Sequence, residues 1–254
     1  MIIKNAYVFD LEQGFEKKDT VIRDGYFSEE QALAAADEPV IDAAENYLIP
    51  GLVDVHFHGC AGHDFSDGTP EALEAIGAYE LKNGITAICP AAMTLSEETL
   101  RGICENAVSV QNGEGTKQSQ NAPGDPSGVT GRQRARLCGI HLEGPFISKE
   151  KKGAQNPAYI MEPDVAMFHR LQEAAHGLVR LITIAPETAG AMDFIDALHD
   201  QVHISLGHTT SDYDTASEAF HLRQQCTAPP TTRRSPSVWR SCTAASRRGR
   251  TGTV

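Results

Sequence analysis

A short apolar run followed by a helical pattern recurs five times between residues 50 and 220, and no other feature of the chain constrains its fold as strongly. The apolar runs span residues 52–56, 85–89, 137–143, 178–184 and 202–206. The helical patterns span residues 70–83, 96–110, 163–176 and 188–199, and a last one begins near residue 211. This alternation predicts an α/β protein with parallel strands and right-handed crossovers. From the residues alone, either a barrel or a doubly wound sheet could begin at the first run.

Local signals mark the ends of two of these helices. Pro70 suits a first helical turn, and Gly84 suits a left-handed stop. Ser96 can cap the second helix, whose first turn carries Glu97 and Glu98. We therefore expect both helices to begin and end close to these residues.

Two regions lie outside the alternation. Residues 1–27 alternate like short strands, with Asp24-Gly25 as a hairpin-type turn, so we expect a small β element over residues 1–48. Residues 112–136 are rich in Gly, Ser, Gln and Pro, which predicts a flexible surface insertion without chemistry. The α/β region then covers residues 49–220.

The composition excludes several classes of protein. No stretch approaches the ~20 apolar residues of a membrane span, and the N-terminus lacks the features of a secretory signal. The six cysteines lie far apart without a C-x-x-C pair, which predicts reduced thiols and a cytoplasmic protein. The net charge of −12 opposes nucleic-acid binding, because backbone phosphates require a basic face.

Residues 221–254 differ sharply from the rest of the chain. They contain seven arginines but no acidic residue and no Ile, Phe or Tyr. With so little to bury, we expect them to be disordered. Two interpretations remain, a basic interaction arm and an out-of-frame translation, and we favour the second.

Four polar residues follow or end the apolar runs. His56 and His58 are two apart on an extended backbone, so their imidazoles point to the same side. Glu143 ends the third run, and His208 follows the fifth. The carboxyl ends of the strands in a parallel barrel meet on one face. We therefore expect these side chains to converge and to hold a divalent metal cation.

Other residues near these runs are weaker candidates. His141 shares a strand face with Glu143. It could either hydrogen-bond to a metal ligand or be a hydrogen-bonded histidine of the core. Cys60 lies beside the histidine pair, but one thiol makes no case for ligation. The remaining histidines are expected to be structural or at the surface: His63, His169, His176, His199 and His203.

Four sequence blocks carry a resemblance to a known family. They are PGLVDVHFHGCAGHDFSDG, NGITAICPAAMTLSEE, GIHLEGPFISKEKKGAQNP and ISLGHTTSDYDTASEAF. Through them the chain resembles the N-acetylglucosamine-6-phosphate deacetylases of the amidohydrolase superfamily. The resemblance covers roughly residues 1–220 apart from the insertion.

The resemblance implies an incomplete (β/α)₈ TIM-type barrel of about five βα units with a small N-terminal β-sandwich element. By motif matching, Glu143 and His208 would bind one metal, and His56 and His58 a second. Ala154 and Gln155 would contact the sugar. The implied cofactor is a divalent cation such as Zn, Fe, Co or Mn.

The implied reaction is the hydrolysis of a phosphorylated amino sugar, N-acetylglucosamine 6-phosphate, to glucosamine 6-phosphate and acetate. The family also implies a possible homodimer for full-length members. No membrane or nucleic acid is expected as a partner.

The resemblance stops near residue 220, before the blocks that carry the family's third metal histidine and catalytic aspartate. We therefore expect a C-terminally truncated or frameshifted chain in which no catalytic residue is present and hydrolysis is slow or absent. The alternative is a catalytically inactive remnant or binding protein with a basic C-terminal arm.

Overall fold

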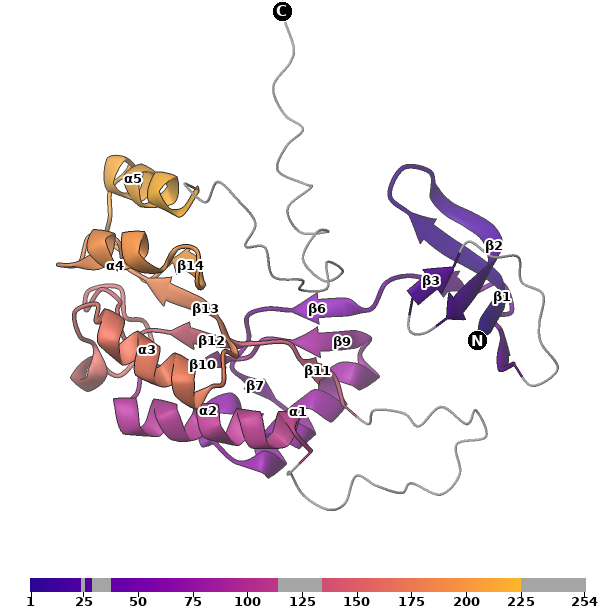
Figure 1. Cartoon of the computed structure of the whole chain (residues 1–254), viewed down its shortest axis with the longest axis horizontal. Coiled ribbons are helices and arrows are strands. Elements are labelled where there is room, and N and C mark those ends of the chain that lie inside the picture. The colour runs from indigo at the N-terminus through magenta and orange to yellow at the C-terminus, as the bar shows by residue number, and fades with distance from the viewer. Residues whose placement is uncertain (24–25, 29–37, 114–133, 225–254) are drawn as a thin grey trace, which may run out of the picture.

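A computed structural model describes residues 1–23, 26–28, 38–113 and 134–224 (Figure 1). The predicted turn at residues 24–25 lies outside these ranges, as do most of the predicted insertion and residues 225–254. None of the helices within the described ranges is long and apolar enough to cross a membrane.

The N-terminal segment forms a five-stranded mixed sheet. Its strands are β1 (Ile2–Asp10), β2 (Gly14–Arg23), β3 (Tyr26–Ser28), β4 (Val40–Asp42) and β5 (Tyr47–Leu48). The central strand β1 pairs antiparallel with β2 and parallel with β4 and β5. The β1–β2 turn is held by the Asp10 side chain, which accepts from the backbone nitrogens of Glu12 and Gln13 at 2.8 and 3.0 Å. The alternation of polar and apolar residues thus forms strands as expected.

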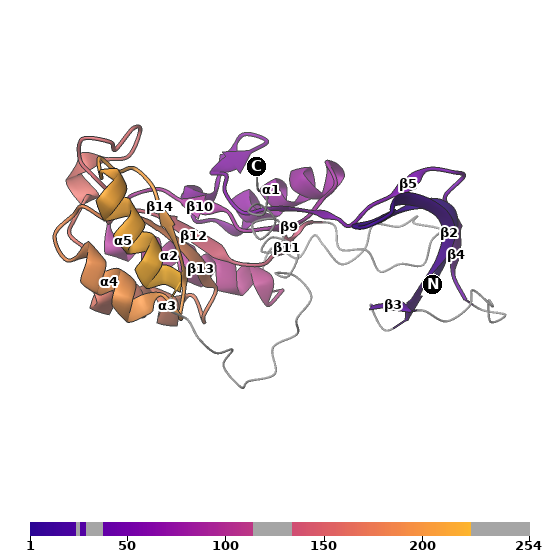
Figure 2. The ribbon, with the colours of Figure 1, turned by 90° about the horizontal axis from the view of Figure 1, so that it is seen from above.

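Of the predicted β-sandwich, the described part of the chain forms this one sheet. Phe15 contacts the rings of both Phe9 and Tyr47, and all three lie exposed, so no layer of the described residues covers them. A sandwich requires a second sheet against such a face. Figures 1 and 2 both show this sheet standing to one side of the α/β region.

The α/β region contains parallel strands whose order in space follows their order in the chain. The strands are β6 (Leu52–Asp54), β9 (Ile85–Ile88), β10 (Ala91–Ala92), β11 (Arg136–Leu137), β12 (Ile140–Glu143), β13 (Val179–Ile184) and β14 (His203–Leu206). β9 lies between β6 and β11, and β12 lies between β10 and β13, which in turn pairs with β14. Backbone hydrogen bonds link the three-stranded sheet to the four-stranded sheet. The backbone nitrogens of Cys138 and His141 donate to the carbonyls of Ile88 and Pro90 at 2.8 and 2.9 Å.

The helices form one layer against these strands. They are α1 (Pro70–Lys82), α2 (Glu97–Gln111), α3 (Val165–Ala174), α4 (Ala191–Leu198) and α5 (Tyr213–Gln224). Each helix packs against the next in the chain, so the strands and helices wind in one direction. The core between them is built from side chains such as Leu73, Ile103, Phe168 and Ile182.

The helix boundaries agree with the local signals. Thr69 and Ser96 accept hydrogen bonds from the first turns of α1 and α2, and Pro70 opens α1. Gly84 follows α1 with a φ of 85°. Short elements complete the region: β7 (Gly59–Cys60), β8 (His63–Asp64) and the 3₁₀ turns η1 (Phe65–Asp67) and η3 (Pro157–Tyr159).

Two predicted boundaries need correction. The insertion was expected to reach residue 136, but Arg134 already bonds to Glu74 and to the carbonyl of Val110 at 3.0 and 2.8 Å. Ala135 is fully buried, and Arg136 lies in β11. The tail was expected to begin at residue 221, but α5 continues to Gln224 and Leu222 packs against the core.

Candidate metal centre

The candidate centre lies at the carboxyl ends of three parallel strands. His56 and His58 follow β6, Glu143 is the last residue of β12, and His208 follows β14 by two residues. Glu143 is 7% exposed, whereas the His56 side chain is 48% exposed, so the group is buried on one side and open on the other. The parallel register brings together residues that are up to 152 positions apart in the sequence.

The four side chains meet at the Glu143 carboxylate. His58 Nε2 lies 2.9 Å from Oε2, and His56 Nε2 lies 3.4 Å from Oε1. His208 Nε2 lies 3.1 Å from Oε1. Ligand atoms of His56, His58 and Glu143 all lie within 4.8 Å of one another, as a shared metal ion requires. The expected convergence is therefore present, while the role of these residues as ligands stays a prediction.

Backbone carbonyls set the proton positions on two of these rings. His58 Nδ1 lies 3.1 Å from the Ala91 carbonyl, and His208 Nδ1 lies 2.8 Å from the Lys151 carbonyl. A carbonyl only accepts, so in both rings Nδ1 carries the proton. The Nε2 lone pairs that face Glu143 are then free to bind a metal, which is the usual arrangement of metal-ligating histidines.

A buried amide holds the carboxylate. Gln155 is 2% exposed, and its Nε2 donates to Glu143 Oε2 at 2.7 Å. The backbone nitrogen of Thr94 donates to Gln155 Oε1 at 2.6 Å, which fixes the direction of the amide. Thr94 Oγ1 also donates to the Glu143 carbonyl at 3.1 Å. Sequence reasoning named Gln155 only as a sugar contact, and its neighbour Ala154 is the exposed member of that pair.

His141 lies beneath the centre and is 2% exposed. Its Nδ1 lies 3.0 Å from His56 Nδ1, and its Nε2 lies 2.8 Å from Thr183 Oγ1. Burial, reinforced by the nearby His56 ring, lowers the pKa of His141 from 6.5 to about 4, so the ring is neutral near pH 7. Thr183 was missed from the sequence, although a hydroxyl near the carboxyl end of an apolar run is a usable signal.

Cys60 takes no part in the group. Its thiol lies 3.9 Å from the Ile76 carbonyl on α1, and burial raises the pKa of Cys60 to about 11, so it stays protonated. All four cysteines of the described residues are free thiols, as expected.

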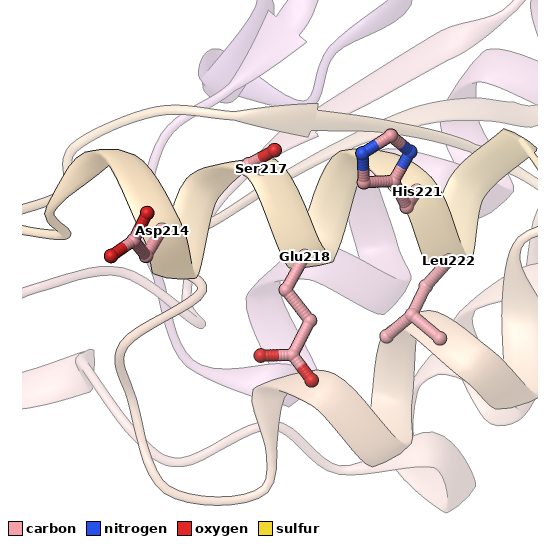
Figure 3. Close-up of a pocket in the computed structure, with 5 residues that line it drawn as sticks. All are labelled: Asp214, Ser217, Glu218, His221 and Leu222. Atoms are coloured by element: carbon pink, nitrogen blue, oxygen red, sulfur yellow. The ribbon is translucent and has the colours of Figure 1, made fainter.

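A separate hollow of about 440 Å³ lies along α5 (Figure 3). Its lining residues all belong to that helix: Asp214, Ser217, Glu218, His221 and Leu222. None of them belongs to the group around Glu143. The hollow therefore does not enlarge the candidate metal centre.

The α/β region thus carries a cluster of histidine and carboxylate side chains at the carboxyl ends of its parallel strands. The sequence pattern of the amidohydrolase family matches residues 47–246, and the chain belongs to that family.

Particular relatives are deacetylases of amino sugar phosphates. The chain is 31% identical over 86% of its length to the N-acetylglucosamine-6-phosphate deacetylase of Bacillus subtilis, of which it covers 50%. It is 27% identical to the N-acetylgalactosamine-6-phosphate deacetylase of Escherichia coli O157:H7, over 73% of this chain and 46% of the relative.

The chain is also similar to a solved structure of such a deacetylase. That structure is of a mutant N-acetyl-D-glucosamine-6-phosphate deacetylase from Mycobacterium smegmatis in complex with N-acetyl-D-glucosamine-6-phosphate. It matches with a TM-score of 0.66 and 27% identity over 87% of this chain and 53% of that one. The chain thus spans about half the length of the relatives it matches. These enzyme relatives do not favour the alternative of a non-catalytic binding protein.

Proposed function

We propose that the chain serves the metal-dependent hydrolysis of N-acetylglucosamine 6-phosphate to glucosamine 6-phosphate and acetate. The observation that carries this proposal is the convergence of three imidazole Nε2 atoms on one buried carboxylate at the strand ends. The names of the relatives supply the substrate class. In the reaction the amide C–N bond breaks, water supplies the new oxygen of acetate, and the amine takes a proton.

The donor atoms fit a divalent transition metal, since imidazole nitrogen and carboxylate oxygen suit Zn, Fe, Co and Mn. We propose that His56, His58 and Glu143 form one site and that His208 shares Glu143 in a second. A bound metal of this kind lowers the pKa of water and polarises a carbonyl group. Gln155 and the two backbone carbonyls orient the ligands, while the exposed side of His56 leaves room for substrate.

We also propose that the α/β region is a sector of a (β/α)₈ barrel. Sequential strand order and one layer of helices support this, because a doubly wound sheet reverses its strand order and carries helices on both faces. Of the predicted sugar contacts, Ala154 is exposed near the centre, whereas both ends of the Gln155 amide are already bonded. We therefore assign sugar contact to the Ala154 position. Free thiols in the described part are in keeping with a cytoplasmic setting.

The test uses a chimera in which residues 1–220 are joined to the remaining half of the B. subtilis relative. We expect this protein to release acetate from N-acetylglucosamine 6-phosphate in the presence of Zn²⁺. Glu143→Gln should abolish the release, and the matched control Glu97→Gln should retain it, because Glu97 bonds to Arg170 between α2 and α3 instead. A folded chimera that releases no acetate, or that is indifferent to Glu143→Gln, would contradict the proposal.

The 254-residue chain alone is expected to be slower than the chimera. Among the described residues, the group of His56, His58 and Glu143 contains one carboxylate, and we propose that carboxylate as a metal ligand rather than as a general base. A positioned base supplies roughly 10²–10⁴-fold in rate. Equal acetate release by the chain and the chimera would show that this expectation is wrong.

A further inference from the structure

His141 is the buried titratable group that the proposed reaction leaves unused. It lies on β12, two residues before Glu143, and therefore shares a strand face with that carboxylate. Its ring centroid is 4.9 Å from that of His56, and the two Nδ1 atoms are 3.0 Å apart. His141 is thus in contact with a proposed ligand without being a member of the ligand group.

His56 differs from the other two imidazoles in the partner of its Nδ1. His58 and His208 each place Nδ1 against a backbone carbonyl, which can only accept a hydrogen bond. The Nδ1 of His56 faces a ring nitrogen, which accepts only if its own proton lies on the opposite nitrogen. The orientation of His56 therefore depends on the proton position in His141.

Thr183 supplies an acceptor for a proton on His141 Nε2. Its Oγ1 on β13 lies 2.8 Å from His141 Nε2 and can accept the proton of that nitrogen. His141 Nδ1 then has a lone pair that can accept the Nδ1–H of His56, although the Val55 backbone also lies within hydrogen-bonding reach of the His141 ring. Only in this arrangement is the Nε2 lone pair of neutral His56 directed at the centre; the reverse arrangement would put a proton on Nε2 and block ligation.

We propose that His141, held by Thr183, is a positioning residue that accepts the Nδ1–H of His56 and keeps His56 Nε2 free for a divalent metal. The inference rests on the proposed metal centre and adds the chain Thr183–His141–His56 to it. The His141 side chain would thus accept the Nδ1 proton of His56, as backbone carbonyls accept the Nδ1 protons of His58 and His208.

The test measures Co²⁺ and Zn²⁺ affinity of the full 254-residue protein by competition with a chelator, together with the visible absorption of bound Co²⁺. His141→Leu removes the acceptor, whereas His141→Asn keeps an oxygen near the former Nδ1. Loss of an outer-shell partner commonly costs 10–100-fold in metal affinity. We expect a loss of about that size and an altered Co²⁺ spectrum for His141→Leu, with His141→Asn within about threefold of the wild type.

Thr183 provides a second pair should His141→Leu fail to fold. Thr183→Val removes the hydroxyl and should weaken binding, whereas Thr183→Ser keeps it and should not. His199→Leu is the control for loss of an imidazole elsewhere, since His199 bonds to the Asp196 carbonyl.

The outcomes separate this inference from the proposed function. Wild-type affinity and an unchanged Co²⁺ spectrum in folded His141→Leu, or in Thr183→Val, would overturn the inference alone. Failure of the wild-type protein to bind either metal would overturn the proposed centre and this inference with it.

Discussion

The Glu143 carboxylate faces imidazole nitrogens of His56, His58 and His208 at 2.9–3.4 Å and accepts from Gln155 at 2.7 Å. The Gln155 amide donates to this buried carboxylate, and a bound cation between it and the imidazoles would balance its charge, because burial without such partners carries a large desolvation cost. Each partner is itself fixed by a further contact, so the geometry at Glu143 depends on several residues outside the ligand group.

His141 predicts a pH dependence of stability. Burial holds its pKa at about 4 in the folded chain, against 6.5 when exposed, so the unfolded chain binds the proton first as pH falls. The stability from His141 is therefore complete above about pH 6.5 and is lost progressively toward pH 4, by at most about 3 kcal/mol.

Urea unfolding of the metal-free protein at pH 7 and pH 5 measures this loss. We expect the wild type to lose about 2 kcal/mol more than His141→Asn, which cannot bind the proton at that position. An equal loss in the two proteins would show that His141 is charged in the folded state.

At the residue scale, sequence position identified the residues at the strand ends but not their partners. His56, His58, Glu143 and His208 stand out because each follows or ends an apolar run. The bond from His141 to Thr183 joins residues 42 positions apart and depends on the register of β12 against β13. Register is a tertiary property, so the sequence left the role of His141 open.

At the scale of elements, the turn after β12 packs against Thr94, which in turn holds the residues of the candidate metal centre. Gly144 has a φ of 100°, and a Cβ there would lie 2.1 Å from Thr94 Oγ1. Thr94 holds both Gln155 and the Glu143 carbonyl, so displacing it would move the carboxylate.

Gly144→Ala should therefore lower stability and metal affinity together. Gly84→Ala is the matched control, because Gly84 has a φ of 85° with nothing within 4 Å of its added Cβ. The control should cost only the ~1–2 kcal/mol of left-handed backbone, with metal affinity unchanged. Denaturant unfolding and chelator competition check both variants, and equal effects on metal affinity would refute the link through Thr94.

Elements were predicted best where a local signal exists. Ser96 caps α2, Pro70 opens α1 and Gly84 follows it, because these effects act within a single turn. The end of the insertion was misplaced because Arg134 and Ala135 are ordered by contacts with α1 and α2 rather than by their own sequence.

At the scale of the whole molecule, the N-terminal sheet carries an exposed aromatic cluster. The Phe15 ring contacts Phe9 in a tilted arrangement at 5.3 Å and Tyr47 edge-on at 4.7 Å between ring centroids, and all three are exposed. Contiguous exposed apolar surface favours association. We expect Phe15→Ser to reduce self-association in light scattering, whereas Tyr213→Ser, which removes an exposed ring on α5, outside the aromatic cluster, should not. Equal scattering by wild type and Phe15→Ser would exclude the cluster as the contact.

The parallel α/β class was predictable from five repeats of strand and helix, but the residues alone left open a doubly wound sheet or one-way winding, and only the family resemblance implied a barrel. That choice depends on which strands pair. The pairing of β6 with β9 and of β12 with β13 is a property of the folded chain, and no residue pattern within the strands specifies it. The covering of the N-terminal sheet was likewise beyond the sequence, since alternation in β1 and β2 does not specify what lies on each face.

The most direct test of the metal centre is anomalous diffraction from crystals of the protein soaked in Zn²⁺. The account predicts an anomalous peak about 2.0–2.2 Å from His56 Nε2, His58 Nε2 and a Glu143 oxygen. Glu143→Gln crystals treated in the same way should lack it. A peak elsewhere in the chain, or none at these three side chains in ordered wild-type crystals, would contradict the account.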